Sequence, residues 1–165
     1  MELRLDGQVA IVTGASRGIG AAIADLLAQA GARVAGTATT DAGAGAIGER
    51  LREFGPDNAG YTLDVNDPDG PAGLVAAVGE RQGAPTILVN NAGITRDQIL
   101  LRMKDEDWDV IMETNLRSVF RMSKACLRGM MKARGGRIIS IASVIGSMSR
   151  MRRARRSSRA SVVDW

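Results

Sequence analysis

The chain has 165 residues, of which 45% are hydrophobic and 24% are charged, which is enough apolar material for the core of one domain. It contains no histidine, which excludes Ser-His-Asp and Cys-His nucleophile systems and leaves almost no ligands for a zinc or haem site. The single cysteine, Cys126, excludes an internal disulfide. No apolar run approaches the roughly 18–20 residues that span a bilayer, and no signal peptide is visible, so we expect a cytoplasmic protein with no metal and no membrane contact.

The net charge of +4 is unevenly distributed along the chain. Residues 149–165 hold six arginines and one acid, a net charge of +5, so the preceding 148 residues carry a net charge of −1. This C-terminal segment is rich in arginine, serine and alanine and shows no sustained helical or strand periodicity. The sequence therefore predicts two parts: a globular domain at 1–148 and a disordered Arg-rich tail at 149–165.

Short β-branched runs alternate with longer amphipathic stretches through the globular part. In chain order, the predicted elements are a strand at 8–12, a helix at 18–30, a strand at 32–37, a helix at 43–54, a strand at 61–65, a helix at 67–83 with Pro68 in its first turn, a strand at 86–89, a helix at 105–133 and a strand at 137–141. The residues at helical spacing in the first helix are Ile19, Ile23, Leu26 and Leu27. Such alternation is typical of an α/β fold, a Rossmann-type doubly wound parallel sheet with its ligand crevice at the carboxyl ends of the strands.

A glycine-rich stretch, Thr13-Gly14-Ala15-Ser16-Arg17-Gly18-Ile19-Gly20, lies directly between the first strand and the first helix. Glycines at this point let the chain turn sharply and let a pyrophosphate approach backbone N–H groups, and the helix N-terminus adds unpaired donors. The alternative is a tight strand-to-helix turn without a ligand. The position after the first strand favours phosphate binding, and the candidate residues are Gly14, Ser16, Arg17, Gly18, Ile19 and Gly20.

Three further motifs lie at strand ends or in the long helix: Asn90-Asn91-Ala92-Gly93 after the fourth strand, Asn115, and Ser143 after the fifth strand. With the Thr-Gly-x-x-x-Gly-x-Gly spacing, they resemble the short-chain dehydrogenase/reductase family. The runs 93–97, 101–105 and 113–120 resemble one branch, the 3-oxoacyl-[acyl-carrier-protein] reductases of fatty acid synthesis.

The resemblance covers about residues 5–148 and carries expectations about fold and activity. It implies an incomplete domain with about five strands in the order 3-2-1-4-5 and a homotetramer whose interface is incomplete here. It also implies NADPH-dependent reduction of a 3-oxoacyl group, carried on acyl carrier protein, to the 3-hydroxyacyl product.

The residues at the end of the second predicted strand indicate whether the chain prefers NAD or NADPH. Enzymes that bind NAD usually have an acid there, which hydrogen-bonds the ribose 2′-hydroxyl. This end reads Gly36-Thr-Ala-Thr39, and Asp41 lies beyond the strand end. Arg17 offers a cation to a 2′-phosphate and Thr37 offers a hydroxyl, so we expect NADPH.

The resemblance also implies roles for residues at the later strand ends. Asp64 matches the position that contacts the adenine amino group, with Val65 beside it in the cofactor-binding set, and the alternative for Asp64 is a solvated loop acid. Asn91, with Ala92 and Gly93, would line the nicotinamide side, and the alternative is an asparagine that ties down a loop.

Two candidate catalytic residues are also implied by the resemblance. Asn115 would bend the long helix and hold a water for a proton relay, and the alternative is an exposed polar residue. Ser143 would hydrogen-bond the substrate carbonyl, and the alternative is the polar end of a buried strand.

The family's proton donor has no counterpart in this chain. The family uses a tyrosine thirteen residues after the serine and a lysine four residues further on, and these positions hold Arg156 and Ala160. The only tyrosine is Tyr61, and an arginine is effectively never deprotonated, so we expect no turnover. The amino-acid sequence after Met148 resembles the translation of a coding region in the wrong reading frame, which implies a truncated family member.

Non-catalytic functions remain as alternatives: a fragment that binds NADP, or a nucleic-acid binder that uses the basic tail. The tail lacks interleaved aromatic residues, which argues against base stacking, so nucleic acid is the weaker alternative.

The strand at 137–141 is expected to be a bare sheet edge and the helix at 105–133 to lack partners, which predicts aggregation of the isolated chain.

Overall fold

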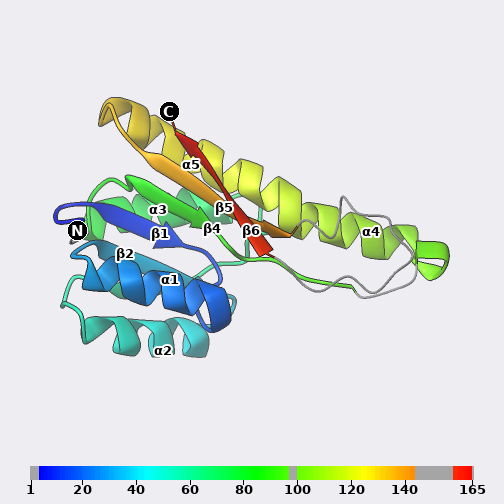
Figure 1. Cartoon of the computed structure of the whole chain (residues 1–165), viewed down its shortest axis with the longest axis horizontal. Coiled ribbons are helices and arrows are strands. Elements are labelled where there is room, and N and C mark those ends of the chain that lie inside the picture. The colour runs from blue at the N-terminus through cyan, green and yellow to red at the C-terminus, as the bar shows by residue number, and fades with distance from the viewer. Residues whose placement is uncertain (1–3, 97–99, 144–157, 165) are drawn as a thin grey trace.

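The computed structural model describes residues 4–96, 100–143 and 158–164, and it contains one six-stranded sheet in the order β3-β2-β1-β4-β5-β6 (Figure 1). The strands are β1 (Val9–Val12), β2 (Arg33–Ala38), β3 (Ala59–Thr62), β4 (Ile87–Asn90), β5 (Arg137–Ser143) and β6 (Ser158–Asp164). The first five strands pair in parallel, which confirms the predicted Rossmann-type sheet and its order 3-2-1-4-5.

Helices cover both faces of the sheet. They are α1 (Gly18–Gln29), α2 (Asp41–Arg52), α3 (Gly70–Arg81), the short η1 (Leu100–Arg102), α4 (Asp105–Met112), η2 (Glu113–Arg117) and α5 (Ser118–Lys132). Helices α1 and α2 lie on one side of the sheet, and α3 and α5 lie on the other (Figure 1). None of the helices in the described ranges is long and apolar enough to cross a bilayer.

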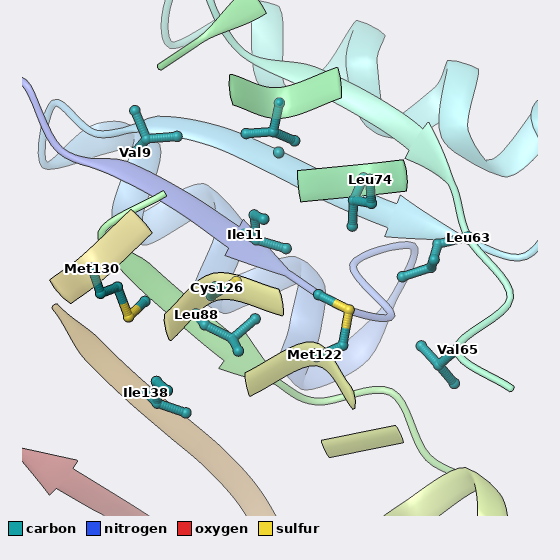
Figure 2. Close-up of a cluster of buried hydrophobic side chains, with 12 residues drawn as sticks. Val9, Ile11, Leu63, Val65, Leu74, Leu88, Met122, Cys126, Met130 and Ile138 are labelled. Carbon is teal, nitrogen blue, oxygen red and sulfur yellow. The ribbon is translucent and has the colours of Figure 1, made fainter. Parts of the chain in front are cut away.

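The core has two layers, because successive strand residues point to opposite faces. In β1, Val9 and Ile11 face α3 and α5, whereas Ala10 and Val12 face α1 and α2. Figure 2 shows the α5 side, where Met122, Cys126 and Met130 meet the strands. Burial raises the pKa of the Cys126 thiol to about 12, so this cysteine serves as core packing.

Helix α1 buries a different face from the one its large apolar residues indicate. Its buried residues are Gly20, Ala24 and Ala28, whereas Ile19 is 52% exposed and Leu26 is 63% exposed. Ile23 and Leu27 pack at the edge of the core. A face of small residues lets the helix axis lie close to the sheet, which brings the N-terminus of α1 down to the end of β1.

Two predicted boundaries are wrong for local reasons. Helix α3 begins at Gly70, with Pro71 in its first turn, because the Asp67 carboxylate instead accepts a hydrogen bond from the Asp69 N–H at 3.1 Å and forms a turn. Strand β3 covers Ala59–Thr62 rather than 61–65, because its partner β2 ends at Ala38, which lies opposite Thr62.

The predicted long helix is not α-helical throughout. Between α4 and α5, residues 113–117 form a single π-helical turn, η2. The Ser118 hydroxyl donates to the Thr114 carbonyl oxygen inside this turn. Such turns are frequent at functional sites, and this one carries Asn115.

The prediction of a wholly disordered tail and a bare edge at β5 is wrong for residues 158–164. These residues form β6, which pairs antiparallel with β5 from Arg137↔Asp164 to Ser143↔Ser158. An edge strand presents a row of unpaired N–H and C=O groups, which pair with any extended segment within reach. Residues 144–157 and 165 lie outside the described structure, so the prediction for that part of the tail is not tested there.

Removal of residues 158–165 tests the role of β6. The Arg137 N–H donates to the Thr86 carbonyl oxygen on the β4 side, so the alternation along the strand directs the N–H groups of Ile138 and Ser140 toward β6. Without β6 these groups lose their partners, so we expect the amides of Ile138 and Ser140 to exchange with solvent faster and the protein to aggregate at a lower temperature. Hydrogen exchange and light scattering measure both effects. Unchanged exchange of the β5 amides would contradict the pairing of β5 with β6.

Candidate cofactor cleft at the carboxyl ends of the strands

A cleft of about 450 Å³ opens where the carboxyl ends of β1, β2, β3 and β4 meet. It is lined by nine of the twelve predicted cofactor-binding residues: Gly14, Ser16, Arg17, Thr37, Asp64, Val65, Asn91, Ala92 and Gly93. The other three, Gly18, Ile19 and Gly20, form the first turn of α1 next to it. The structure therefore brings together residues that lie up to about 80 positions apart in the sequence.

The loop between β1 and α1 needs its glycines for two separate reasons. Gly14 and Gly18 have φ values of 66° and 59°, in the left-handed region that side chains rarely adopt. Gly20 is required for space, because an added Cβ would overlap the Gly14 carbonyl oxygen and the Asn91 side-chain amide. Apart from its chain neighbours and its own helix, no atom of the described residues lies within 4 Å of the point where a Cβ on Gly18 would be, so the loop is open on that side.

Asn91 ties the glycine loop to the end of β4. Its side-chain amide donates to the carbonyl oxygens of Thr13 and Gly14, both at 3.0 Å. In return, the Thr13 hydroxyl oxygen accepts from the N–H groups of Asn91 and Ala92, both at 3.0 Å. The loop-tying contact proposed for Asn91 is therefore present, and because Asn91 also lines the cleft, its role on the nicotinamide side stays a prediction.

The end of β2 carries hydroxyls and no carboxylate. The Thr37 hydroxyl oxygen accepts from the Gly14 N–H at 3.3 Å, and Thr37 and Thr39 line the cleft. Asp41 lies beyond the strand, as predicted, at the first position of α2, where it accepts from the Thr62 hydroxyl at 2.6 Å. Asp41 is not among the residues that line the cleft.

Arg17 and Asp64 give the cleft its charged groups. Arg17 is exposed and forms no ion pair with any residue in the described ranges. Asp64 is also exposed, and its carboxylate accepts from the Asn66 N–H at 2.9 Å, which is a local turn rather than an ion pair. A positive group therefore stands at the glycine loop and a negative group at the end of β3.

Asn115 clamps the loop that follows β4. Its side-chain oxygen accepts from the Ile94 N–H and its side-chain nitrogen donates to the Ile94 carbonyl oxygen, both at 2.8 Å. The neighbouring Glu113 pairs with Arg117 at 2.8 Å and with Arg121 at 2.6 Å. The π-helical turn is thus fixed to the wall of the cleft.

The remaining candidate positions are only partly described. Ser143 is the last residue of β5, and only its backbone position is described. Arg156 lies outside the described residues, and Ala160 lies in β6 opposite Ile141. Tyr61 is not a substitute for the missing tyrosine, because it lines no part of the cleft, donates to the Gln82 side-chain oxygen at 3.3 Å, and has a pKa that burial raises.

Sequence reasoning missed several residues of the cleft. Asn66 and Thr114 contribute to its walls, and the Asn66 side-chain oxygen is buried with no hydrogen-bond partner in the described structure. Arg50 of α2 donates to the carbonyl oxygen of Ala15 in the glycine loop at 2.8 Å. No motif marks these residues, because their role depends on which helix covers which strand end.

Two basic residues at the C-terminal end of the predicted helix at 105–133, Lys132 and Arg134, do not line the cleft. Lys132 ends α5, and Arg134 lines a separate hollow with Gly135 and Gly136, directly before β5 begins. Since β5 is parallel to β4, this hollow is at the amino end of the sheet. These cations therefore lie at the opposite end of the sheet from the cleft.

Replacement of Gly20 by alanine tests the close contact beneath the loop. Gly20→Ala forces a Cβ against the Gly14 carbonyl and the Asn91 amide, so we expect a loss of about 2–3 kcal/mol in the free energy of unfolding. The matched control is Gly45→Ala in the exposed part of α2, where nothing lies within 4 Å of the new Cβ. This control should stabilise the protein by about 0.5–1 kcal/mol. Thermal or denaturant unfolding measures the stability of both variants. Equal changes in the free energy of unfolding would contradict the close approach of Gly20 to Gly14 and Asn91.

Known proteins with a similar sequence or structure belong to a single family of dehydrogenases and reductases. A sequence model of the short chain dehydrogenase family matches residues 8–158. The FabG 3-oxoacyl-[acyl-carrier-protein] reductases of Vibrio cholerae and Escherichia coli are 55% and 54% identical over 146 residues, each match covering 88% of this chain and 59% of the relative. A crystal structure described as a candidate short-chain alcohol dehydrogenase from Sinorhizobium meliloti matches with a TM-score of 0.82 and 38% identity, over 87% of this chain and 57% of that chain. The chain therefore spans less than two thirds of these relatives, and it belongs to the short chain dehydrogenase family.

Proposed function

We propose that the cleft binds NADPH and that this chain carries the cofactor-binding part of a 3-oxoacyl-[acyl-carrier-protein] reductase. The observation that supports the proposal most strongly is the cleft itself. It combines the glycine loop at the N-terminus of α1 with Arg17 and Thr37 and has no carboxylate at the end of β2. The proposed activity is that of the Vibrio cholerae and Escherichia coli relatives, which are 3-oxoacyl-[acyl-carrier-protein] reductases.

Each cleft residue has a part in this proposal. The loop N–H groups and the α1 N-terminus hold the pyrophosphate, because backbone donors and the positive end of the helix dipole favour an anion. Arg17 and Thr37 hold the 2′-phosphate, and Asp64 and Val65 contact the adenine. Gly93 and its neighbours line the nicotinamide side, where Asn115 fixes the backbone of Ile94.

The proposed chemistry is reduction of a carbonyl group. When bound, the cofactor supplies the hydride. Ser143 donates a hydrogen bond to the substrate carbonyl and holds it at the end of β5, and Asn115 supports a water on the proton path. The alkoxide that develops needs a proton donor, and these 165 residues contain no Tyr-x-x-x-Lys. We therefore infer that this chain binds the cofactor without turning over substrate.

Self-association is part of the same proposal. The successive helices α4, η2 and α5 carry exposed apolar residues: Trp108 is 51% exposed, Leu116 is 59% exposed and Phe120 is 63% exposed. Leu116 and Phe120 line a surface groove of about 730 Å³ along η2 and α5. Contiguous apolar surface of this kind marks protein interfaces, which supports a homo-oligomer.

The oligomer predicts that one charge at this groove will separate the subunits. Phe120→Asp adds a carboxylate to an interface that excludes water, so we expect a smaller sedimentation coefficient at the same protein concentration. Leu26→Asp on α1 is the control, because Leu26 is equally exposed, at 63%, and lies on another face. A wild-type protein that stays monomeric at every concentration would contradict the proposal.

Arg17 predicts the preference between the two nicotinamide cofactors. The wild-type chain should bind NADPH more tightly than NADH. Arg17→Met should weaken NADPH binding by about tenfold or more, since a hydrogen bond to a charged group contributes about 1.5–3 kcal/mol, and leave NADH binding unchanged. Fluorescence titration measures all four affinities. Equal binding of the two cofactors by the wild type would remove the argument from Arg17.

The missing tyrosine and lysine predict an absence of turnover. We expect no loss of NADPH absorbance when the chain is mixed with a 3-oxoacyl thioester, in a sample whose cofactor binding has been measured. That binding is the internal control, because it shows that the cleft is formed. Sustained NADPH oxidation that depends on the thioester would contradict the view that the tyrosine and lysine are indispensable.

A further inference from the structure

We propose that Arg50 is a positioning residue that turns the Ser16 N–H toward the cleft so that it can donate to a ligand phosphate. The inference rests on the proposed function, because it concerns how the same site binds its cofactor. Arg50 lies on α2, outside every motif that the sequence carries.

The side chain of Arg50 joins three separate parts of the chain. Its Nη2 donates to the Ala15 carbonyl oxygen in the glycine loop at 2.8 Å. Its Nε donates to an Asp25 carboxylate oxygen on α1 at 2.9 Å. The Arg50 side chain is 30% exposed and that of Asp25 is 28% exposed. Because both groups are partly buried, this pair holds a defined geometry better than an exposed surface pair does.

The two peptide groups that flank Ala15 are each held by one contact. The Ala15 N–H donates to the Thr37 carbonyl oxygen at 2.8 Å, so the loop is held on the β2 side. The Ala15 carbonyl is held on the other side by Arg50. A trans peptide is planar, and its C=O and N–H point in opposite directions. With the Ala15 oxygen directed at Arg50, the Ser16 N–H of the same peptide points away from Arg50.

The Ser16 N–H lies at the cleft, where it can donate to a ligand. Ser16 lines the cleft, and its backbone N–H has no acceptor within the parts of the chain that the structure describes. An unpaired backbone N–H next to a helix N-terminus is a donor for an anion. If the peptide turned over, the Ala15 oxygen would face the cleft and repel a phosphate. Ala15 is fully buried, so loss of Arg50 also leaves a buried acceptor without a partner and favours that change.

The test compares two ligands that differ in the phosphates. ADP-ribose carries the pyrophosphate, whereas adenosine occupies only the adenine end of the cleft. We expect Arg50→Met to weaken ADP-ribose binding about tenfold and adenosine binding less than twofold, in titrations followed by NMR. Arg52→Met is the matched control, because Arg52 is exposed on the same helix and contacts neither the loop nor Asp25 in the described structure. It should change neither affinity.

Two further variants separate positioning from structural support. Arg50→Lys keeps a donor for the Ala15 oxygen and should recover at least threefold of the lost ADP-ribose affinity. Asp25→Asn keeps the size of its side chain but releases the charge that holds Arg50, and it should give a smaller loss, again only for ADP-ribose. Circular dichroism confirms that each variant is folded.

The outcomes that overturn the inference are distinct. Equal weakening of adenosine and ADP-ribose by Arg50→Met would mean that Arg50 only holds α2 against α1. Unchanged ADP-ribose binding would mean that the peptide is oriented without Arg50. In both cases the wild type still binds, so the proposed function stands. A wild type that binds neither ligand would remove the proposed function and the inference together.

Discussion

The cleft depends on the hydrogen bonds that join the ends of two adjacent strands, β1 and β4. Four of them involve Thr13 or Asn91: the Thr13 hydroxyl oxygen accepts from the N–H groups of Asn91 and Ala92, and the Asn91 side-chain amide donates to the carbonyl oxygens of Thr13 and Gly14. These bonds satisfy polar groups that a buried strand end would otherwise leave unpaired. Beyond this point the chain leaves β1 toward α1 on one face and leaves β4 toward η1 and α4. The cleft lies where these two connections separate, as is general for doubly wound sheets.

Further contacts at the cleft connect α1, β2, α2 and η2 to the loops that follow β1 and β4. Gly20 lets α1 approach the loop, Thr37 brings β2 against Gly14, and Arg50 brings α2 against Ala15. On the other side, Asn115 attaches η2 to Ile94. Each contact uses a main-chain group of the loops after β1 or β4. The polar residues of the site therefore hold backbone in place.

The sequence predicted the elements whose signal is local. The β-branched runs marked β1, β4 and β5, because strands buried on both faces need continuous apolar residues. The motifs after β1 and β4 marked six residues of the cleft, and Thr37, Asp64 and Val65 were marked at the ends of β2 and β3. Features set by distant partners were missed. Strand β6 depends on the open edge of β5, the buried face of α1 depends on close approach to the sheet, and Arg50 depends on where α2 lies over the glycine loop.

The most direct test of the account is a map of backbone amide shifts when NADPH is added to nitrogen-15-labelled protein. The account predicts shifts at Gly14 to Gly18, at Thr37, at Asp64 to Asn66 and at Asn91 to Ile94, which line or adjoin the cleft. It predicts none at the amino end of the sheet, where Arg4, Gln8 and Arg137 line a different hollow. Shifts confined to that amino end, with the glycine loop unchanged, would contradict the assignment of the cleft.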